Sequence, residues 1–223
     1  MTSPRAILLL LAKAPQAGRV KTRLCPPAAP VQAARIAAAA LLDTLAALRA
    51  VPGGQTVVAL AGDLAGAERC EEISAALHDL PVIPQRGTTL GQRIAACHTD
   101  AADLLPGLAS LQVGMDTPQA DPSLLARCLR RLDRPGTGAV LGPALDGGWW
   151  ALGLRDPRAA VAIADVATSR ADTGARTAHA LRGHGLTVGR LPNLRDVDTI
   201  ADARTVAAAI PASRFAAAVR ELP

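Results

Sequence analysis

The segment AILLLLAKAPQAGRVKTRL, residues 6–24, joins an apolar run to a strongly basic loop. The seven apolar residues 6–12 are long enough for a buried strand and much too short to span a membrane. Lys13, Lys21 and Arg23 follow at once, whereas a secretory signal would pass into a neutral cleavage region. We therefore expect a buried opening strand followed by a loop that carries function.

The rest of the chain repeats this alternation of short apolar runs with longer segments of helical period, which is typical of β–α units around a mainly parallel sheet. Strands are predicted at residues 6–12, 56–61, 81–83, 110–113, 139–141, 149–152 and 187–191. Helices are predicted at residues 31–49, 65–77, 90–104, 122–132, 171–182 and 200–209. The fold class is therefore α/β, and ligands should bind beyond the carboxyl ends of the strands.

Length and composition favour one globular domain. The chain has 223 residues, of which 50% are apolar and 19% charged, and a single core accommodates that length. Phe215, Trp149 and Trp150 are the only aromatic residues, so the core must be built from Ala, Leu, Val and Ile. No stretch after the first strand approaches the roughly 18 apolar residues of a membrane span, and we expect no membrane partner.

Net charge and cysteine content indicate which binding partners and which cellular compartment to expect. The net charge is +5, but the arginines are scattered, and the chain lacks the basic stripe and stacking aromatics of nucleic-acid binders. The four cysteines form no C-x-x-C pair, so we expect neither zinc nor disulfides but core cysteines in the cytoplasm. Homodimerisation is left open.

The basic loop is the candidate phosphate site. Of the 24 lysines and arginines only Lys13 and Lys21 are lysines, and both lie in this loop with Gly18 and Arg23. Ammonium groups bind phosphate oxygens as point charges, and a guanidinium can add a bidentate contact. The spacing does not fit a Walker A motif. A solvated basic turn on an exposed loop is the alternative.

Two carboxylate segments could supply a metal site. Asp116 follows the apolar run that ends at Val113, and Pro118 turns the chain there. Mg²⁺, or Mn²⁺ in its place, needs only one or two protein carboxylates besides phosphates and waters, and Asp198 is the expected partner, with Asp196 as second choice. A backbone-capping role for Asp116 is equally compatible with the sequence.

Two glycine-containing segments complete the candidate site. Asp146, Gly147, Gly148 and Trp149 stand between two predicted strands and could bind an acceptor, although a tight Asp-Gly hairpin explains them as well. Strand alternation places Trp149 and Trp150 on opposite faces.

A further stretch, residues 85–93, contains Arg86, Gly87 and Gly91 at a helix start, where it could contact a nucleotide or be an ordinary loop. The four histidines show no metal-ligand spacing, and we expect them at the surface or at helix ends.

Four motifs together resemble the DUF2064 family of glycosyltransferase-A-like proteins. They are Ala12-Lys-Ala-Pro-x-x-Gly-x-Val-Lys-Thr-Arg-Leu24, Gly114-x-Asp-x-Pro118, Gly142-Pro-x-x-Asp-Gly-Gly148 and Asp196-Val-Asp-Thr199. They are more distantly similar to 2-phospho-L-lactate guanylyltransferase and the molybdenum-cofactor nucleotidyltransferases. The resemblance implies a three-layer α/β/α nucleotide-diphospho-sugar transferase fold, with residues 1–116 binding the nucleotide and residues 117–223 the acceptor.

The resemblance also implies roles for single residues. Lys21 and Arg23 become phosphate ligands and, with Asp116, the catalytic residues; Asp116 and Asp198 become metal ligands. Lys13 would support the phosphate tail. From the residues themselves we further expect Ala14, Gly18, Arg86, Gly87 and Gly91 to bind the nucleotide. Trp149 stands where such proteins commonly have tyrosine, which leaves the acceptor undefined.

Three functions follow as hypotheses. The first is Mg²⁺-dependent nucleotidyl transfer from a nucleoside triphosphate to a small phosphorylated or hydroxyl acceptor. The second is glycosyl transfer from a nucleotide sugar, which the same fold supports. The third is a non-catalytic nucleotide-binding protein, against which the presence of Asp116 argues. The basic loop, and the lack of an Asp-x-Asp pair around Asp116, favour the first.

Overall fold

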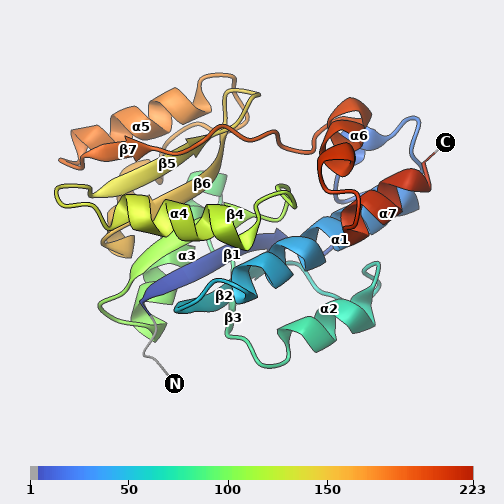
Figure 1. Ribbon diagram of the computed structural model, residues 1–223, viewed down its shortest axis with the longest axis horizontal. Coiled ribbons are helices and arrows are strands. Elements are labelled where there is room, and N and C mark those ends of the chain that lie inside the picture. Colours follow the sequence, from blue (N-terminus) through green and yellow to red (C-terminus); the bar gives the residue numbers. More distant parts are fainter. Residues whose placement is uncertain (1–4, 223) are drawn as a thin grey trace.

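Seven strands form one mixed sheet in the order β3-β2-β1-β4-β6-β5-β7 in the computed structural model, which describes residues 5–222 (Figure 1). The strands are β1 (Ala6–Lys13), β2 (Gly54–Ala61), β3 (Val82–Pro84), β4 (Ala109–Gly114), β5 (Ala139–Pro143), β6 (Trp149–Leu154) and β7 (Val188–Arg190). All pairings are parallel except those of β6, which is antiparallel to both β4 and β5. The predicted α/β class and mainly parallel sheet are confirmed.

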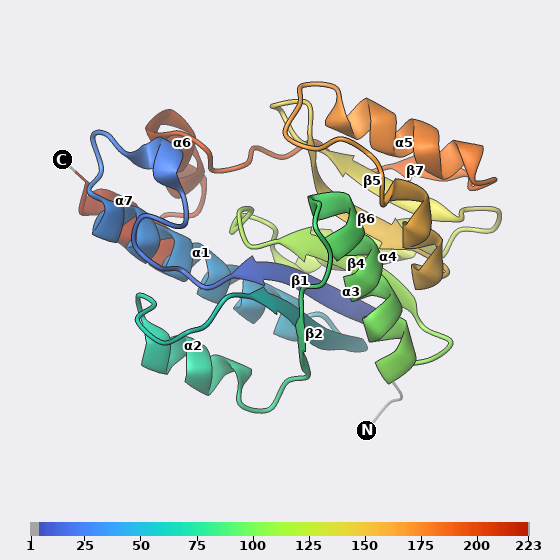
Figure 2. The ribbon, with the colours of Figure 1, turned by 180° about the vertical axis from the view of Figure 1, so that it is seen from behind.

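Helices cover both faces of the sheet and so complete three layers. They are α1 (Pro30–Arg49), α2 (Cys70–Leu77), α3 (Leu90–Leu104), α4 (Pro122–Leu132), α5 (Thr173–Gly183), α6 (Ile200–Ala209) and α7 (Arg214–Arg220), with 3₁₀ turns η1 (Thr22–Leu24) and η2 (Pro157–Ile163). One face packs against α1, α2 and α4. The other packs against α3, η2 and α5, and Figure 2 shows α3 in front of the sheet.

β1 is apolar throughout because both of its faces are covered. Leu8 and Leu10 pack on the side of α1 and α4, whereas Ile7 and Leu9 pack against α3. All four side chains are fully buried. A central parallel strand buried on both faces reads as a continuous apolar run, and this is what the opening segment shows.

α1 is the helix that the membrane expectation overlooked. By length and composition Pro30–Arg49 could cross a bilayer. The expectation that no segment after the first strand is apolar enough for a membrane span is therefore wrong for this helix. However, 67% of its apolar window is buried inside the protein. One side of α1 packs on the sheet and the other on α7, which runs beside it in Figure 1, in a cluster that α6 also joins. Burial on two sides explains the apolar composition.

The largest difference between a predicted and an observed element boundary is at the start of α2, and the local backbone conformation explains it. The helix predicted from residue 65 begins only at Cys70. Gly66 has φ +73° and Arg69 has φ +55°, and both values are incompatible with an α-helix. η2 and α7 were not predicted at all.

The cysteine prediction is confirmed in part. Cys97 and Cys128 are buried, whereas Cys25 and Cys70 are only half-buried, and all four are free thiols. Burial raises the pKa of both the Cys97 and the Cys128 thiol to about 11, so these two behave as inert core residues.

Candidate functional site

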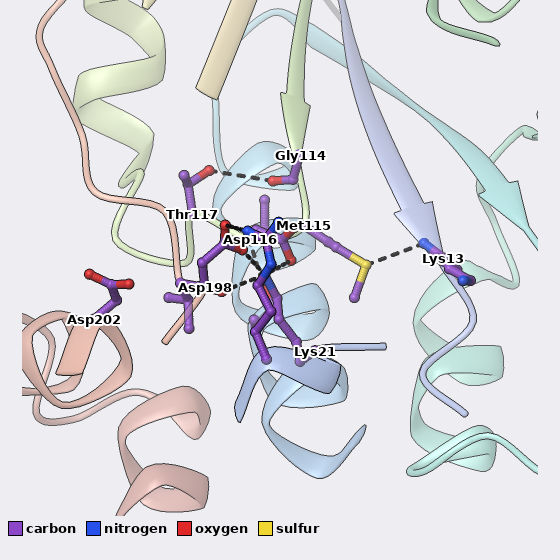
Figure 3. Close-up of polar contacts among 12 residues, drawn as sticks. Lys13, Lys21, Gly114, Met115, Asp116, Thr117, Asp198 and Asp202 are labelled. Carbon is purple, nitrogen blue, oxygen red and sulfur yellow. Dashed lines mark hydrogen bonds and ion pairs between the residues drawn. The ribbon is translucent and has the colours of Figure 1, made fainter. Parts of the chain in front are cut away.

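The Lys21 ammonium lies between two carboxylates beyond the carboxyl ends of β1 and β4 (Figure 3). Its Nζ is 2.9 Å from Asp116 Oδ1 and 3.6 Å from Asp198 Oδ1, and it also donates to the Val197 carbonyl. An ammonium group has three N–H donors; one of them binds the Val197 carbonyl, while the two carboxylates pair with the charge. The side chain is only 8% exposed, so the alternative of a solvated turn does not hold for this lysine.

The backbone holds Lys21 in an uncommon conformation. Its φ of 48° and ψ of 37° are left-handed, and the residue precedes η1 directly. Such a conformation costs a non-glycine residue free energy, and it occurs preferentially at functional sites. The left-handed backbone of the loop thus directs the Lys21 side chain toward the two carboxylates.

The two carboxylates arrive from distant parts of the chain. Asp116 follows β4 directly, whereas Asp198 ends the segment between β7 and α6. Thr199 caps α6 together with Asp202, which fixes the backbone just after Asp198. Arg23 Nη1 binds Asp198 Oδ2 at 2.9 Å. The structure thus brings Lys21, Arg23, Asp116 and Asp198 together, as the sequence predicted.

The basic cavity is a hollow of about 280 Å³ beside this cluster. Its lining residues are Lys13, Arg19, Val20, Lys21, Thr22, Arg23, Ala37, Met115, Asp116 and Asp198. Lys13 Nζ donates to the Arg19 carbonyl at 2.9 Å and so closes the loop on itself. Within residues 5–222 Arg19 forms no ion pair, which leaves its charge available to an anion.

Two residues predicted in the loop lie off the cavity wall. Ala14 is buried and donates its N–H to the Ala61 carbonyl. Gly18 has φ +73°, and a Cβ there would meet no atom within 4 Å. Gly18 is therefore explained by the turn itself, and a nucleotide contact for either residue stays a prediction.

A larger hollow of about 530 Å³ adjoins the basic cavity, and we call it the tryptophan cavity. The residues that line it are Leu11, Arg23, Leu90, Ile94, Gln112, Gly114, Met115, Asp116, Thr117, Asp146, Gly148, Trp149, Trp150, Thr168, Ser169, Arg170, Ala171, Thr173, Asp196 and Asp198. Arg23, Met115, Asp116 and Asp198 line both cavities. The cluster around Lys21 therefore lies at the junction of two spaces.

Asp196 is the least satisfied carboxylate of the tryptophan cavity. Burial, followed by the neighbouring charges of Asp146 and Asp116, raises its pKa to about 7. Its Oδ1 is buried without a hydrogen-bond partner among residues 5–222. Buried polar atoms in folded proteins are nearly always paired, so this oxygen is prepared for a donor from outside the chain.

The turn from Asp146 to Gly148 is a tight hairpin turn that also borders the tryptophan cavity, and acceptor binding by it stays a prediction. It is the turn of the β5–β6 hairpin, in which Asp146 Oδ1 accepts from the Gly148 N–H at 2.8 Å. Gly147 has φ +89°, and a Cβ would lie 1.9 Å from the Ala171 carbonyl oxygen. Gly147 is thus required by the turn, while Asp146, Gly148 and Trp149 also line the tryptophan cavity.

The two tryptophans lie on opposite faces of β6, as predicted. Trp150 is buried in the layer of α1 and α4, and its Nε1 donates to the Pro192 carbonyl at 2.9 Å. Trp149 packs with the α5 and η2 layer, and its Nε1 donates to Thr177 Oγ1 at 3.1 Å. Both indole N–H groups are satisfied, so what remains for a ligand in the cavity is the ring surface.

The stretch at residues 85–93 lies apart from the cluster. Arg86 forms an ion pair with Asp100, and a Cβ on Gly91 would lie 2.5 Å from the Ile163 carbonyl oxygen. Arg86, Gly87 and Gly91 line neither cavity, although Leu90 lines the tryptophan cavity. Close packing explains Gly91, and a nucleotide contact for the three residues stays a prediction.

A buried polar network on β4 escaped the sequence analysis. His98 is fully buried, which corrects the expectation of a surface or helix-end position. Its ring nitrogens contact Ser110 Oγ at 2.9 Å and Gln112 Oε1 at 3.1 Å. The available signal was two polar residues, Ser110 and Gln112, alternating inside an apolar strand.

Comparison with known proteins supports the family and the fold. A family model for DUF2064, an uncharacterized protein conserved in bacteria, matches residues 44–170, which include Asp116 and the β5–β6 hairpin but not the basic loop. A protein from Desulfovibrio desulfuricans G20, provisionally assigned as a nucleotide-diphospho-sugar transferase, has the same fold with a TM-score of 0.85. It is 26% identical over 98% of this chain and 95% of its own.

More distant structures share the fold. CMP:2-keto-3-deoxy-manno-octonic acid synthetase, in complex with CTP, has a TM-score of 0.56 at 13% identity, covering 93% of this chain and 98% of its own. The 2-C-methyl-D-erythritol 4-phosphate cytidylyltransferase of Thermus thermophilus has a TM-score of 0.53 at 18% identity, covering 93% and 99%. No protein with a curated description matches the sequence. The architecture is that of nucleotide-diphospho-sugar transferases.

Proposed function

The chain belongs to the DUF2064 family, and from this membership and its transferase fold we propose that it is a metal-dependent, nucleotide-utilising transferase. The proposed reaction is nucleotidyl transfer from a nucleoside triphosphate to a small acceptor. The basic cavity would hold the triphosphate, and the tryptophan cavity would hold the acceptor.

One observation carries the proposal: Lys21, Arg23, Asp116 and Asp198 meet where the two cavities join. A transfer reaction needs the donor phosphate and the acceptor side by side. The cations of the basic loop line one of these spaces, and the hairpin residues line the other. A purely structural ion-pair cluster would not require two adjoining hollows.

The proposed chemistry places each group in a simple displacement. An acceptor oxygen forms a bond to the α-phosphorus, the bond from that phosphorus to the oxygen bridging to the β-phosphate breaks, and the acceptor proton is released to water. Pyrophosphate leaves toward the basic cavity, where Lys13, Arg19 and Arg23 would stabilise its charge. No covalent intermediate with the protein is required.

The donor set fits Mg²⁺ or Mn²⁺ at Asp116 and Asp198. Both carboxylates already face one cation, the Lys21 ammonium, and a hard divalent ion takes one or two protein carboxylates beside phosphate oxygens. Among residues 5–222 there is no group of three or more His, Cys, Asp or Glu side chains that could hold a metal alone. When bound, the ion would neutralise phosphate charge; Lys21 would then be freed to contact the phosphates.

Glycosyl transfer is the second candidate, and one observation favours it. Asp196-Val-Asp198 is an Asp-x-Asp pair that the fold brings next to Asp116, although it is distant in sequence. Many metal-dependent glycosyltransferases of this fold carry such a pair. In that reaction a nucleoside diphosphate would leave toward the same basic cavity.

The test is a calorimetric binding screen of the four nucleoside triphosphates against common nucleotide sugars, each with and without Mg²⁺. We expect a triphosphate to bind only with the metal, and to release pyrophosphate once an acceptor is added. Binding of nucleotide sugars alone would replace nucleotidyl by glycosyl transfer. Binding of neither class, with the protein folded, would rule out both reactions.

A further inference from the structure

The floor of the tryptophan cavity carries an amide that is buried but not fully satisfied. Gln112 is 2% exposed and lines the cavity. Its Oε1 contacts His98 Nε2, and this is the one side-chain hydrogen bond that Gln112 makes within residues 5–222, so the Nε2 amide group is left for another acceptor. Such a group points to a ligand atom that completes its hydrogen bonding.

His98 fixes which end of this amide the cavity receives. Burial lowers the pKa of His98 to about 4, so the ring is neutral. The Gln112 oxygen can only accept, so His98 Nε2 carries the proton and Nδ1 accepts from the Ser110 hydroxyl. The amide NH₂ is then the end left for the cavity, where it can donate to an oxygen.

The other polar groups of the cavity are mostly acceptors. Four carboxylates line it, from Asp116, Asp146, Asp196 and Asp198. Its two arginines are already paired, Arg23 with Asp198 and Arg170 with Asp172. With Asp116 and Asp198 assigned to the metal, Asp146 and the unpartnered Oδ1 of Asp196 remain for the occupant.

These features together define one kind of ligand. A hydroxyl group both donates and accepts, so it satisfies a carboxylate and an amide NH₂ alike. A phosphate or carboxylate only accepts and would be repelled by the acidic wall. The ring of Trp149 adds an apolar contact, whereas Trp150 is buried on the opposite face of β6. The hydroxyl side chains Thr117, Thr168, Ser169 and Thr173 also line the cavity.

We infer that the tryptophan cavity binds a neutral polyhydroxylated compound, with Gln112 donating to one of its oxygens and Asp196 accepting from one of its hydroxyls. The inference rests on the proposed function for the role of this compound as the acceptor. The inference narrows the acceptor class from a phosphorylated or hydroxyl compound to an uncharged polyol or sugar. His98 is then the residue that positions the Gln112 amide.

Tryptophan fluorescence tests this directly, because Trp149 and Trp150 are the only tryptophans and the chain has no tyrosine. The probes are glycerol, erythritol, D-glucose and myo-inositol, each beside its monophosphate ester, and D-glucosamine beside D-glucose. Each is titrated to about 50 mM, far above the millimolar Kd of a weak ligand. We expect a saturable change with at least one neutral probe, and at least about tenfold weaker binding of its phosphate ester.

Three variants localise the response. Gln112→Met and Asp196→Asn should each weaken binding of the neutral probe by about fivefold or more, because each removes a hydrogen bond. Asp133→Asn, at an exposed carboxylate that does not line the cavity, should leave it unchanged. Thermal melting checks that each variant is folded, and if Asp196→Asn is not, Gln112→Met decides.

Three results would overturn the inference: no response to any neutral probe, tighter binding of a phosphate ester, or tighter binding of D-glucosamine than of D-glucose. Calorimetric nucleotide binding separates this failure from failure of the proposed function. Nucleotide binding without a polyol response removes only the inference. A polyol response without nucleotide binding removes only the proposed transferase reaction.

Discussion

The ammonium of Lys21, from the loop after β1, lies 2.9 Å from the carboxylate of Asp116, from the end of β4. These are the two groups that the sequence predicted to meet, and the contact places them at the junction of both cavities. It also makes Lys21 a structural residue, because its side chain is largely buried, pairs with two carboxylates and donates to the Val197 carbonyl.

Replacing Lys21 should therefore affect stability as well as binding. Lys21→Met removes the only cation paired with Asp116 within residues 5–222, leaves Asp198 with Arg23 alone, and leaves the Val197 carbonyl without its donor. We expect the free energy of unfolding to fall by about 2 to 3 kcal/mol, measured by urea denaturation. Arg19→Met, at an unpaired loop cation, should change it by less than about 0.5 kcal/mol. Equal stability of Lys21→Met and the parent protein would contradict the buried ion pair.

The same variant should bind a divalent metal more tightly. In the parent protein the ammonium competes for the two carboxylates that we assign to the metal. Without nucleotide, Lys21→Met should bind Mn²⁺ at least about tenfold more tightly, as followed by the electron paramagnetic resonance of free Mn²⁺. Adding Asp116→Asn should abolish the gain. An unchanged Mn²⁺ affinity would mean that these carboxylates do not hold the ion.

Stability should depend on pH through His98. The folded-state pKa is about 4 and the ordinary value 6.5, so the unfolded chain takes up the proton first as the pH falls. Stability present above pH 6.5 is then lost progressively down to pH 4. Between about pH 7.5 and about pH 5, the parent should lose about 2 kcal/mol that His98→Gln does not lose. Parallel pH profiles of the two proteins would show that His98 is not buried neutral.

Gly91 tests whether packing or nucleotide binding explains the glycines of residues 85–93. A Cβ there would lie 2.5 Å from the Ile163 carbonyl oxygen and 2.6 Å from that of Ala164. Gly91→Ala should lower the free energy of unfolding by about 1 to 3 kcal/mol, measured by urea denaturation. Gly183→Ala, where a Cβ meets nothing within 4 Å, is the matched control and should be neutral or slightly stabilising. Loss of nucleotide affinity without loss of stability in Gly91→Ala would favour a binding role instead.

Much of this architecture can be predicted from local signals. Every strand was placed within a few residues, because apolar runs flanked by polar loops specify buried strands independently of tertiary contacts. α7 was missed because it is short and alanine-rich, and it is stabilised by burying Phe215 against α1 rather than by its own pattern. η2 was missed for a related reason: its proline-started turn has no helical period.

Burial at the site depended on contacts that no local pattern contains. Lys21 looked solvated because the acceptor at Val197 and the carboxylate at Asp198 come from the other end of the chain. His98 looked like a surface residue of an amphipathic helix, since its partners Ser110 and Gln112 lie on a different element. In both cases the residue type and its sequence neighbours suggested an exposed side chain. The partners that bury it come from distant segments, which only the sheet topology brings together.

The reversed direction of β6 has a consequence for how this protein could diversify. Because β6 runs opposite to β4, its first residues, Trp149 and Trp150, lie at the same edge of the sheet as the last residues of β4. In the proposed reaction the hairpin would supply part of the acceptor cavity, with Asp146, Gly148 and Trp149, while the opening loop would hold the anionic tail. If that proposal holds, exchanging the hairpin would change the preferred acceptor and leave the proposed donor site intact.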